Sequence, residues 1–77
     1  MNLDEYLDIF VSEMRRILKE HELKKGDSWK QQDDQYLVDK LFQEIHEFEI
    51  KNDPNYELID IANSCFLLWS KRKFFNL

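Results

Sequence analysis

Two pairs of acidic residues are the part of this sequence best suited to chemistry. Glu44 and Glu47 form one pair, Glu57 and Asp60 the other, and each pair has i, i+3 spacing. On an α-helix this spacing places both side chains on one face, one turn apart. Mg²⁺ prefers hard oxygen ligands, and substrate phosphates commonly complete its coordination shell. If the two pairs face each other, they predict a site for Mg²⁺, with Mn²⁺ as an alternative.

The same residues also fit a charged helix surface exposed to water. Glu is common on helices, and Glu47 could form an ion pair with Lys51 at i+4. The second pair favours the metal site, because Glu57 and Asp60 begin an otherwise apolar segment in which Asn63 continues the polar strip. Polar groups in such a segment cost free energy unless they are hydrogen-bonded, paired or bound to a metal.

The first of three segments that must position these residues runs over about 3–21. Its apolar residues fall in one sector of a helical projection and its charged residues lie opposite, which predicts an amphipathic helix. Gly26 can take positive φ at little cost, so the helix should end there. We assign no chemistry to His21, near the end of this helix. Trp29, in the polar stretch that follows, could plug the end of a core or line a ligand pocket.

The other two segments should form an antiparallel pair of helices. The second begins at Asp33 or Asp34, either of which can cap it, and continues to Lys51. The third, over about 56–73, is apolar around most of its circumference and should be the central, buried helix. A turn at 52–55 makes the two helices antiparallel neighbours. The two carboxylate pairs can then face each other across one interface.

The composition favours one small all-α domain over residues 1–77. The chain has 77 residues, 43% of them hydrophobic, with one Gly and one Pro, too few turn-forming residues for an all-β fold. This length suits one domain and not two. We expect a short antiparallel bundle of about three helices per chain. Chains of this size rarely build a sufficient core alone, and a single Cys excludes an internal disulfide, so oligomerisation should complete the bundle.

Charge and hydropathy exclude several other classes of protein. With 11 Lys and Arg against 16 Asp and Glu, the net charge is −5, the wrong sign for holding nucleic acid. The chain has no signal-like N-terminus and no apolar run long enough to span a bilayer, and its single Cys65 lies in an apolar run. These features predict a cytoplasmic protein without nucleic-acid or membrane partners. The apolar tail, 74–77, should pack on a neighbouring subunit or fold back on the core, with disorder as the alternative.

The acidic pattern resembles that of a known enzyme family. The run Glu44-Ile-His-Glu47, followed by Glu57-Leu-Ile-Asp-Ile-Ala-Asn63, is similar to the E-x-x-E … E-x-x-D signature of the MazG-like nucleotide pyrophosphohydrolases. These belong to the all-α NTP pyrophosphatase superfamily. Two further stretches resemble the short members from phages and prokaryotes: Lys24-Lys-Gly-Asp-Ser-Trp29 and Tyr36-Leu-Val-Asp-Lys-Leu-Phe-Gln-Glu44. The resemblance covers about residues 23–70.

This resemblance implies an enzyme that hydrolyses nucleoside triphosphates, often deoxy or non-standard ones, to the monophosphate and pyrophosphate. Mg²⁺ would be held by the four acidic positions Glu44, Glu47, Glu57 and Asp60. Glu47 would orient the attacking water, Asn63 would lie beside the metal, and Trp29 and Lys25 would approach the nucleotide. The family assembles as homodimers or homotetramers, often with a second subunit completing the site. The alternative is a non-catalytic helical oligomer or interaction module with an inactive acidic site.

Overall fold

The computed structural model describes residues 1–50 and 54–75 and shows a small all-α fold. Its elements are three α-helices and one 3₁₀ turn: α1 (Leu3–Lys25), η1 (Ser28–Lys30), α2 (Asp34–Ile50) and α3 (Pro54–Phe74). The residues within these two ranges contain no strand. The predicted all-α class with about three helices is confirmed.

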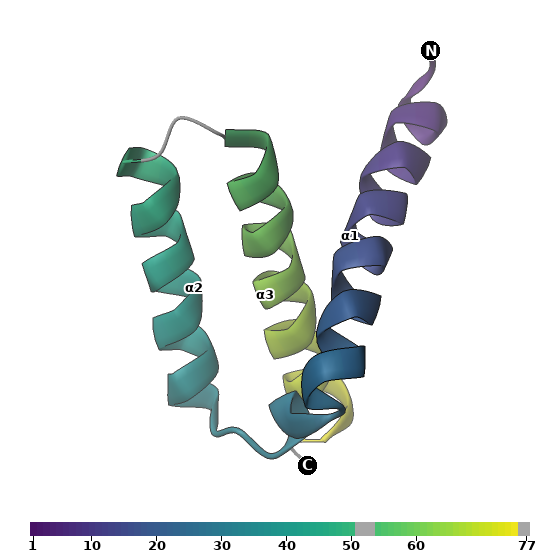
Figure 1. Ribbon diagram of the computed structural model, residues 1–77. Helices are drawn as coiled ribbons and strands as arrows, with labels where there is room; N and C mark the ends of the chain where they lie inside the picture. Colours follow the sequence, from purple (N-terminus) through teal and green to yellow (C-terminus); the bar gives the residue numbers. More distant parts are fainter. Residues whose placement is uncertain (51–53, 76–77) are drawn as a thin grey trace.

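Helix α3 lies between α1 and α2, as Figure 1 shows. It runs antiparallel to α2 and packs closely against it, and it also contacts α1. The N-terminal half of α1 extends away from α3 toward the N-terminus (Figure 1). The predicted central position of the third helix is therefore confirmed, and so is its antiparallel pairing with the second.

Local signals fix the ends of α1. The side chain of Asn2 caps the start by accepting a hydrogen bond from the backbone N–H of Glu5, with N and Oδ1 2.9 Å apart. Gly26 ends the helix with φ of +60°, a conformation that costs a glycine little. The stop at Gly26 was predicted, although the helix continues beyond residue 21 to Lys25.

The starts of α2 and α3 also follow from single residues. Asp33, not Asp34, is the cap of α2, because its Oδ1 accepts a hydrogen bond from the backbone N–H of Tyr36 at 2.8 Å. Helix α3 begins at Pro54, whose fixed φ suits the first position of a helix. Asn55 was predicted in the turn and instead belongs to the first turn of α3. The rest of that turn, residues 52 and 53, lies outside the described residues.

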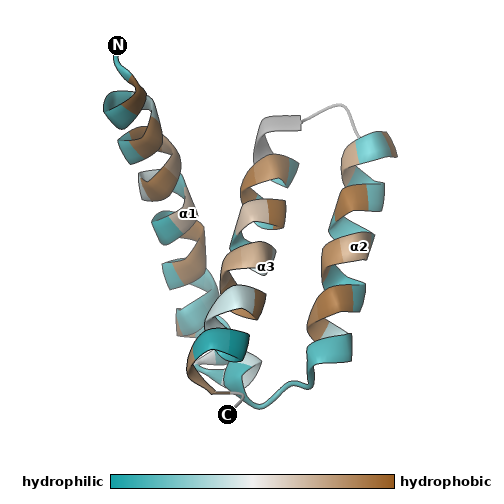
Figure 2. Ribbon diagram, turned by 180° about the vertical axis from the view of Figure 1, so that it is seen from behind, coloured by the Kyte–Doolittle hydropathy of each residue, from teal (hydrophilic) through white to brown (hydrophobic). Residues whose placement is uncertain are grey.

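The apolar core is small. Within the described ranges, only two hydrophobic residues are buried, Ile17 of α1 and Leu37 of α2. The buried positions of α3 are polar instead: Glu57, Asn63, Ser64, Ser70 and Lys71. Figure 2 shows hydrophobic positions along all three helices, and many of these residues remain exposed.

The third helix, predicted to be central and buried, is central but only partly buried. The exposed positions on α3 include five apolar ones: Leu58, Cys65, Phe66, Trp69 and Phe74. The physical reason is that α1 and α2 flank α3 on two sides and leave part of its circumference uncovered (Figure 1).

In the described part of the chain, no helix combines the length and apolarity needed to cross a membrane.

Candidate functional site

The two carboxylate pairs lie on the two helices that pack against each other, α2 and α3. Burial raises the pKa of Glu44 above its ordinary value, and the charges of Asp60 and Glu47 raise it further. Burial likewise raises the pKa of Asp60, with additional contributions from Glu57 and Glu47. The antiparallel packing therefore places Asp60 of α3 within electrostatic reach of both Glu44 and Glu47 of α2.

Glu44 is held by a hydrogen bond that crosses the interface. The hydroxyl of Ser64 donates to Glu44, with Oγ and Oε1 2.8 Å apart. The second carboxyl oxygen, Oε2, is buried and has no hydrogen-bond partner among the residues that the structure describes. A buried, charged oxygen without a partner costs free energy. A bound proton, a hydrogen-bond donor or a cation would reduce that cost.

The donor set fits a metal ion only in part. Across residues 1–50 and 54–75, no group of three or more His, Cys, Asp or Glu side chains is arranged to hold one. Mg²⁺ commonly uses one or two carboxylates and completes its shell with water and phosphate oxygens. The buried Oε2 of Glu44, which has no hydrogen-bond partner among the described residues, suits that kind of site. Lys51, the expected ion-pair partner of Glu47, lies outside the described residues.

Asn63, expected beside the metal, connects α3 to α1. Its Nδ2 donates a hydrogen bond to the carbonyl oxygen of Met14 at 3.3 Å. Its Oδ1 is buried and finds no hydrogen-bond partner within the described ranges. Asn63 does not line the cavity described next, so its visible role is at the α1–α3 contact.

A cavity of about 710 Å³ opens between α1, η1, the start of α2 and the middle of α3. Its volume falls within the range of small-molecule sites, about 300–1,000 Å³. Lys25 and Trp29, the two residues expected to approach a nucleotide, both line it. Ser64 lines it as well, and because Ser64 also holds Glu44, the cavity adjoins the carboxylates.

Lys40 and His21 line the cavity although neither was predicted as a site residue. Lys40 lines the cavity, and its charge opposes the burial that raises the pKa of both Glu44 and Asp60. Its i, i+4 spacing to Glu44 is the sequence signal that could have identified it. His21 also lines the cavity, and its charge opposes the effect of burial on Asp60. No local pattern marks His21, because the packing of α1 against α3 is what brings it there.

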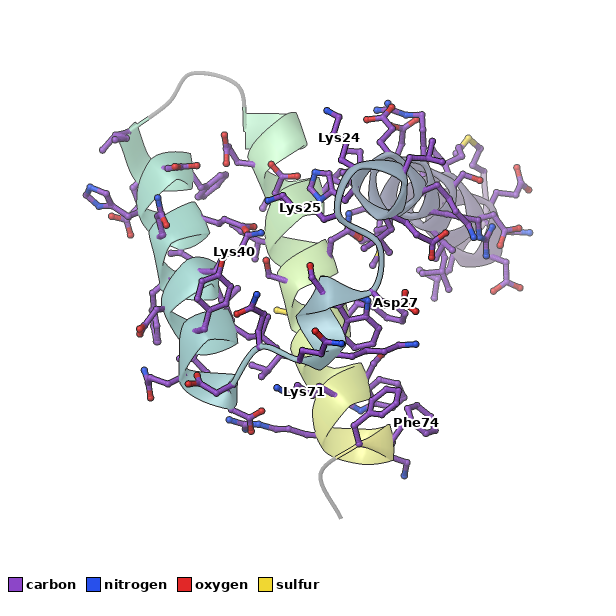
Figure 3. The ribbon with its side chains drawn as sticks, turned by 60° about the horizontal axis from the view of Figure 1, so that its bottom comes forward. Lys24, Lys25, Asp27, Lys40, Lys71 and Phe74 are labelled. Atoms are coloured by element: carbon purple, nitrogen blue, oxygen red, sulfur yellow. The ribbon has the colours of Figure 1, made fainter. Side chains whose placement is uncertain are left out.

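The lysines of this region differ in direction. Figure 3 shows Lys25 of α1 and Lys40 of α2 extending toward α3 from opposite sides, while Lys24 points away. The first two line the cavity and Lys24 does not. The side chains that line the cavity include more Lys and Arg than Asp and Glu, which suits an anionic ligand.

Trp29 is held in place by the end of the chain. Its ring lies edge-to-face against Phe75, with ring centroids 5.9 Å apart. The Nζ of Lys30 lies 5.7 Å from the Trp29 centroid and 5.5 Å from that of Phe75. Trp29 therefore contributes to the cavity wall and to the packing at this end of the bundle, the two roles considered for it. Phe75 folds back onto η1, and residues 76–77 lie outside the described residues.

Ionic contacts join the start of α2 to the end of α3. Arg72 Nε lies 3.2 Å from Oδ2 of Asp34, and Nζ of the buried Lys71 lies 4.0 Å from Oδ1 of the same residue. These contacts hold the start of α2 against the end of α3.

Comparison with known proteins gives no match to this chain among family models, curated proteins or solved structures. The resemblance to the MazG-like enzymes therefore rests on the acidic pattern and its neighbouring motifs, and it stays a hypothesis.

Proposed function

We propose that this protein is a Mg²⁺-dependent nucleoside triphosphate pyrophosphohydrolase similar to the MazG-like enzymes. The observation that carries the proposal is the position of Glu44. Its Oε2 is buried and unpartnered among the described residues, the charges of Asp60 and Glu47 act on the same carboxyl group, and Ser64 links it to a cavity wall that includes Lys25 and Lys40. A ligand that brings both phosphates and a divalent cation would satisfy all of these groups.

The cavity supplies groups for both ends of a nucleotide. Lys25 and Lys40 can each donate charge-assisted hydrogen bonds to phosphate oxygens. Trp29 and Tyr36 line the same cavity, and an aromatic ring can stack on any base. Such stacking discriminates weakly among bases, so the proposed substrates are ribo- and deoxynucleoside triphosphates, including non-standard ones.

The carboxylates supply the reaction centre. One or two of the carboxylates Glu44, Glu47, Glu57 and Asp60 would hold Mg²⁺, with Mn²⁺ as an alternative, and the bound ion would neutralise phosphate charge and lower the pKa of a water molecule. Glu47 would orient the attacking water and accept its proton. The water oxygen forms a bond to the α-phosphorus, the bond to the bridging oxygen breaks, and the products are the monophosphate and pyrophosphate.

The test is incubation of the purified protein with a panel of ribo- and deoxynucleoside triphosphates and Mg²⁺, with products separated by ion-exchange chromatography. The expected products are monophosphate and pyrophosphate, and a chelator should abolish both. Glu47→Gln should stop turnover, whereas Glu49→Gln, at an exposed position on the same helix, should not. No cleavage of any triphosphate, or release of diphosphate and phosphate instead, would overturn the proposal.

A non-catalytic helical oligomer is the second candidate. It is favoured by the lack of any group of three metal-binding side chains within the described ranges. This candidate predicts no cleavage and no rise in melting temperature with Mg²⁺, since a ligand that binds the folded state must stabilise it. A rise without cleavage would indicate an acidic site that binds without turnover.

We also infer that the protein acts in the cytoplasm as a homodimer or homotetramer. Cys65 is a free, exposed thiol, which suits a reducing compartment. Among the described hydrophobic residues, Ile17 and Leu37 alone are buried, a smaller core than a single domain needs.

A further inference from the structure

Gln32 lines the cavity and has no role in the site described so far. It lies in the connection between η1 and α2, three residues after Trp29 and four before Tyr36. Its side chain is half-buried, and its amide forms no hydrogen bond with another described residue. It is also the single Asn or Gln among the described residues that line the cavity. Gln32 therefore offers an unpaired amide to a ligand at this end of the cavity.

One end of the cavity lies beside the carboxylates. Lys40 and His21 mark this end, because both line the cavity and their charges act on Asp60. Tyr36 lies further from the carboxylates, since it precedes Glu44 by eight residues, or about 12 Å along α2. A cation held by the carboxylates draws the phosphates of a nucleotide to the first end. The nucleoside part of the ligand then extends toward Tyr36.

The other end of the cavity, formed by η1 and the start of α2, suits a flat and uncharged group. Trp29 and Tyr36 both line it, and their rings can stack on a base. Asp27 and Lys30 line it as well, but they form an ion pair with each other, with Oδ2 and Nζ 3.0 Å apart. Their opposite charges leave little net charge at this end. Gln32, between the two aromatic residues in sequence, adds an uncharged hydrogen-bonding group.

A Gln side chain matches the edge of a nucleobase. Its oxygen accepts a hydrogen bond and its NH₂ group donates one, and in DNA complexes Gln contacts adenine in this bidentate way. Adenine and cytosine present an amino group next to a ring nitrogen, whereas guanine and uracil present a carbonyl next to a ring N–H. Because no described residue fixes the amide of Gln32, the amide can turn over to suit either arrangement. It can therefore bind both kinds of base.

We propose that Gln32 hydrogen-bonds the Watson–Crick edge of the nucleobase while Trp29 or Tyr36 stacks on its face. This role rests on the proposed function and adds that the site recognises a base as well as a chain of phosphates. The ligands are then nucleotides whose base carries a donor beside an acceptor, and sugar phosphates without a base bind more weakly. A base that lacks one of the two groups leaves part of the amide unsatisfied, which costs affinity.

Calorimetric titration with AMP, GMP and ribose 5-phosphate tests this role without any cleavage. Gln32→Leu should weaken the binding of AMP and of GMP about tenfold, because two hydrogen bonds are lost, and should leave ribose 5-phosphate unaffected. Gln31→Leu is the matched control, since Gln31 is exposed and does not line the cavity, and its three affinities should equal those of the wild type. A wild type that binds neither AMP nor GMP, a loss confined to one of them, or equal effects of the two substitutions would overturn the proposal.

A base analogue tests the hydrogen bonds themselves. Purine riboside 5′-monophosphate lacks the amino group of AMP, so the wild type should bind it about fivefold more weakly than AMP. Gln32→Leu should bind the two ligands equally, and a preference for AMP that persists in this variant would contradict the proposal. The triphosphate panel decides cleavage separately. A chain that cleaves triphosphates without any effect of Gln32→Leu contradicts this role alone, and one that binds AMP through Gln32 but cleaves nothing contradicts the proposed reaction alone.

Discussion

The hydroxyl of Ser64 on α3 donates a hydrogen bond to Oε1 of Glu44 on α2 at 2.8 Å. The bond joins the two helices that carry the four carboxylates, and it fixes one oxygen of Glu44 while Oε2 stays buried without a hydrogen-bond partner in the described part of the chain. Burial raises the pKa of this carboxyl group. Ionisation of Glu44 therefore lowers the stability of the folded protein, and a bound cation would offset this loss.

Glu44→Gln should consequently stabilise the protein in the absence of metal. The amide oxygen of Gln can still accept the hydrogen bond from Ser64, while the buried charge is removed. We expect a melting temperature a few degrees higher than that of the wild type at neutral pH, together with loss of any increase caused by Mg²⁺. Thermal melts with and without Mg²⁺ test this, with the exposed Glu49→Gln as control. A lower melting temperature for Glu44→Gln without metal would contradict it.

The stability should also depend on pH through Glu44 and Asp60. Burial raises both pKa values above their ordinary values of 4.5 and 3.8, so the folded state binds protons more tightly than the unfolded state. Their contribution to stability is fully present below the ordinary pKa values and is lost as pH rises through the raised ones.

Denaturant titrations of the wild type and of a Glu44→Gln, Asp60→Asn double variant measure this effect. The double variant should become progressively more stable than the wild type as pH rises above the ordinary carboxyl range. His21 and Lys40, whose charges oppose the rise, are present in both proteins and do not account for the difference. If the difference in the free energy of unfolding between the two proteins stays constant or becomes smaller as pH rises, the two carboxyl groups are not desolvated.

Local signals made much of the fold predictable, whereas tertiary packing determined the rest. Gly26 and Asp33 mark helix ends through their own backbone and side-chain chemistry, so sequence reasoning located the first end and narrowed the second to Asp33 or Asp34. Lys40 and His21 were passed over because a helix-flank lysine and a helix-end histidine are ordinary features. They reach the cavity only through the way in which α1 and α2 pack on α3, a relationship that no short sequence window contains.

The partial exposure of α3 was missed for a related reason. An apolar circumference indicates that a helix must pack against other elements on most sides. It does not show whether those elements belong to the same chain. Leu58 and Trp69 remain 44% and 57% exposed because the chain supplies only two neighbouring helices to α3.

Lys25 should contribute directly to nucleotide affinity. It lines the cavity and extends toward α3, while the adjacent Lys24 points away (Figure 3). Lys25→Met should weaken triphosphate binding about tenfold, which corresponds to ~1.4 kcal/mol, and Lys24→Met should leave it unchanged. Calorimetric titration with Mg²⁺ and a triphosphate, in a Glu47→Gln background that prevents turnover, measures both. Equal losses in the two variants would indicate a general effect of charge instead.

Phe75 should position Trp29 at the cavity wall. Its ring packs edge-to-face on Trp29 with centroids 5.9 Å apart, and Phe74 makes a similar contact with Trp69 at 5.8 Å. Phe75→Ala and Phe74→Ala therefore each remove one aromatic pair, worth about 0.5–1.5 kcal/mol of stability, but only the first removes the support of Trp29. In a Trp69→Phe background, Phe75→Ala should shift the Trp29 emission to longer wavelength and weaken triphosphate binding, whereas Phe74→Ala should do neither. If the two variants change the emission of Trp29 equally, the position of its ring does not depend on Phe75.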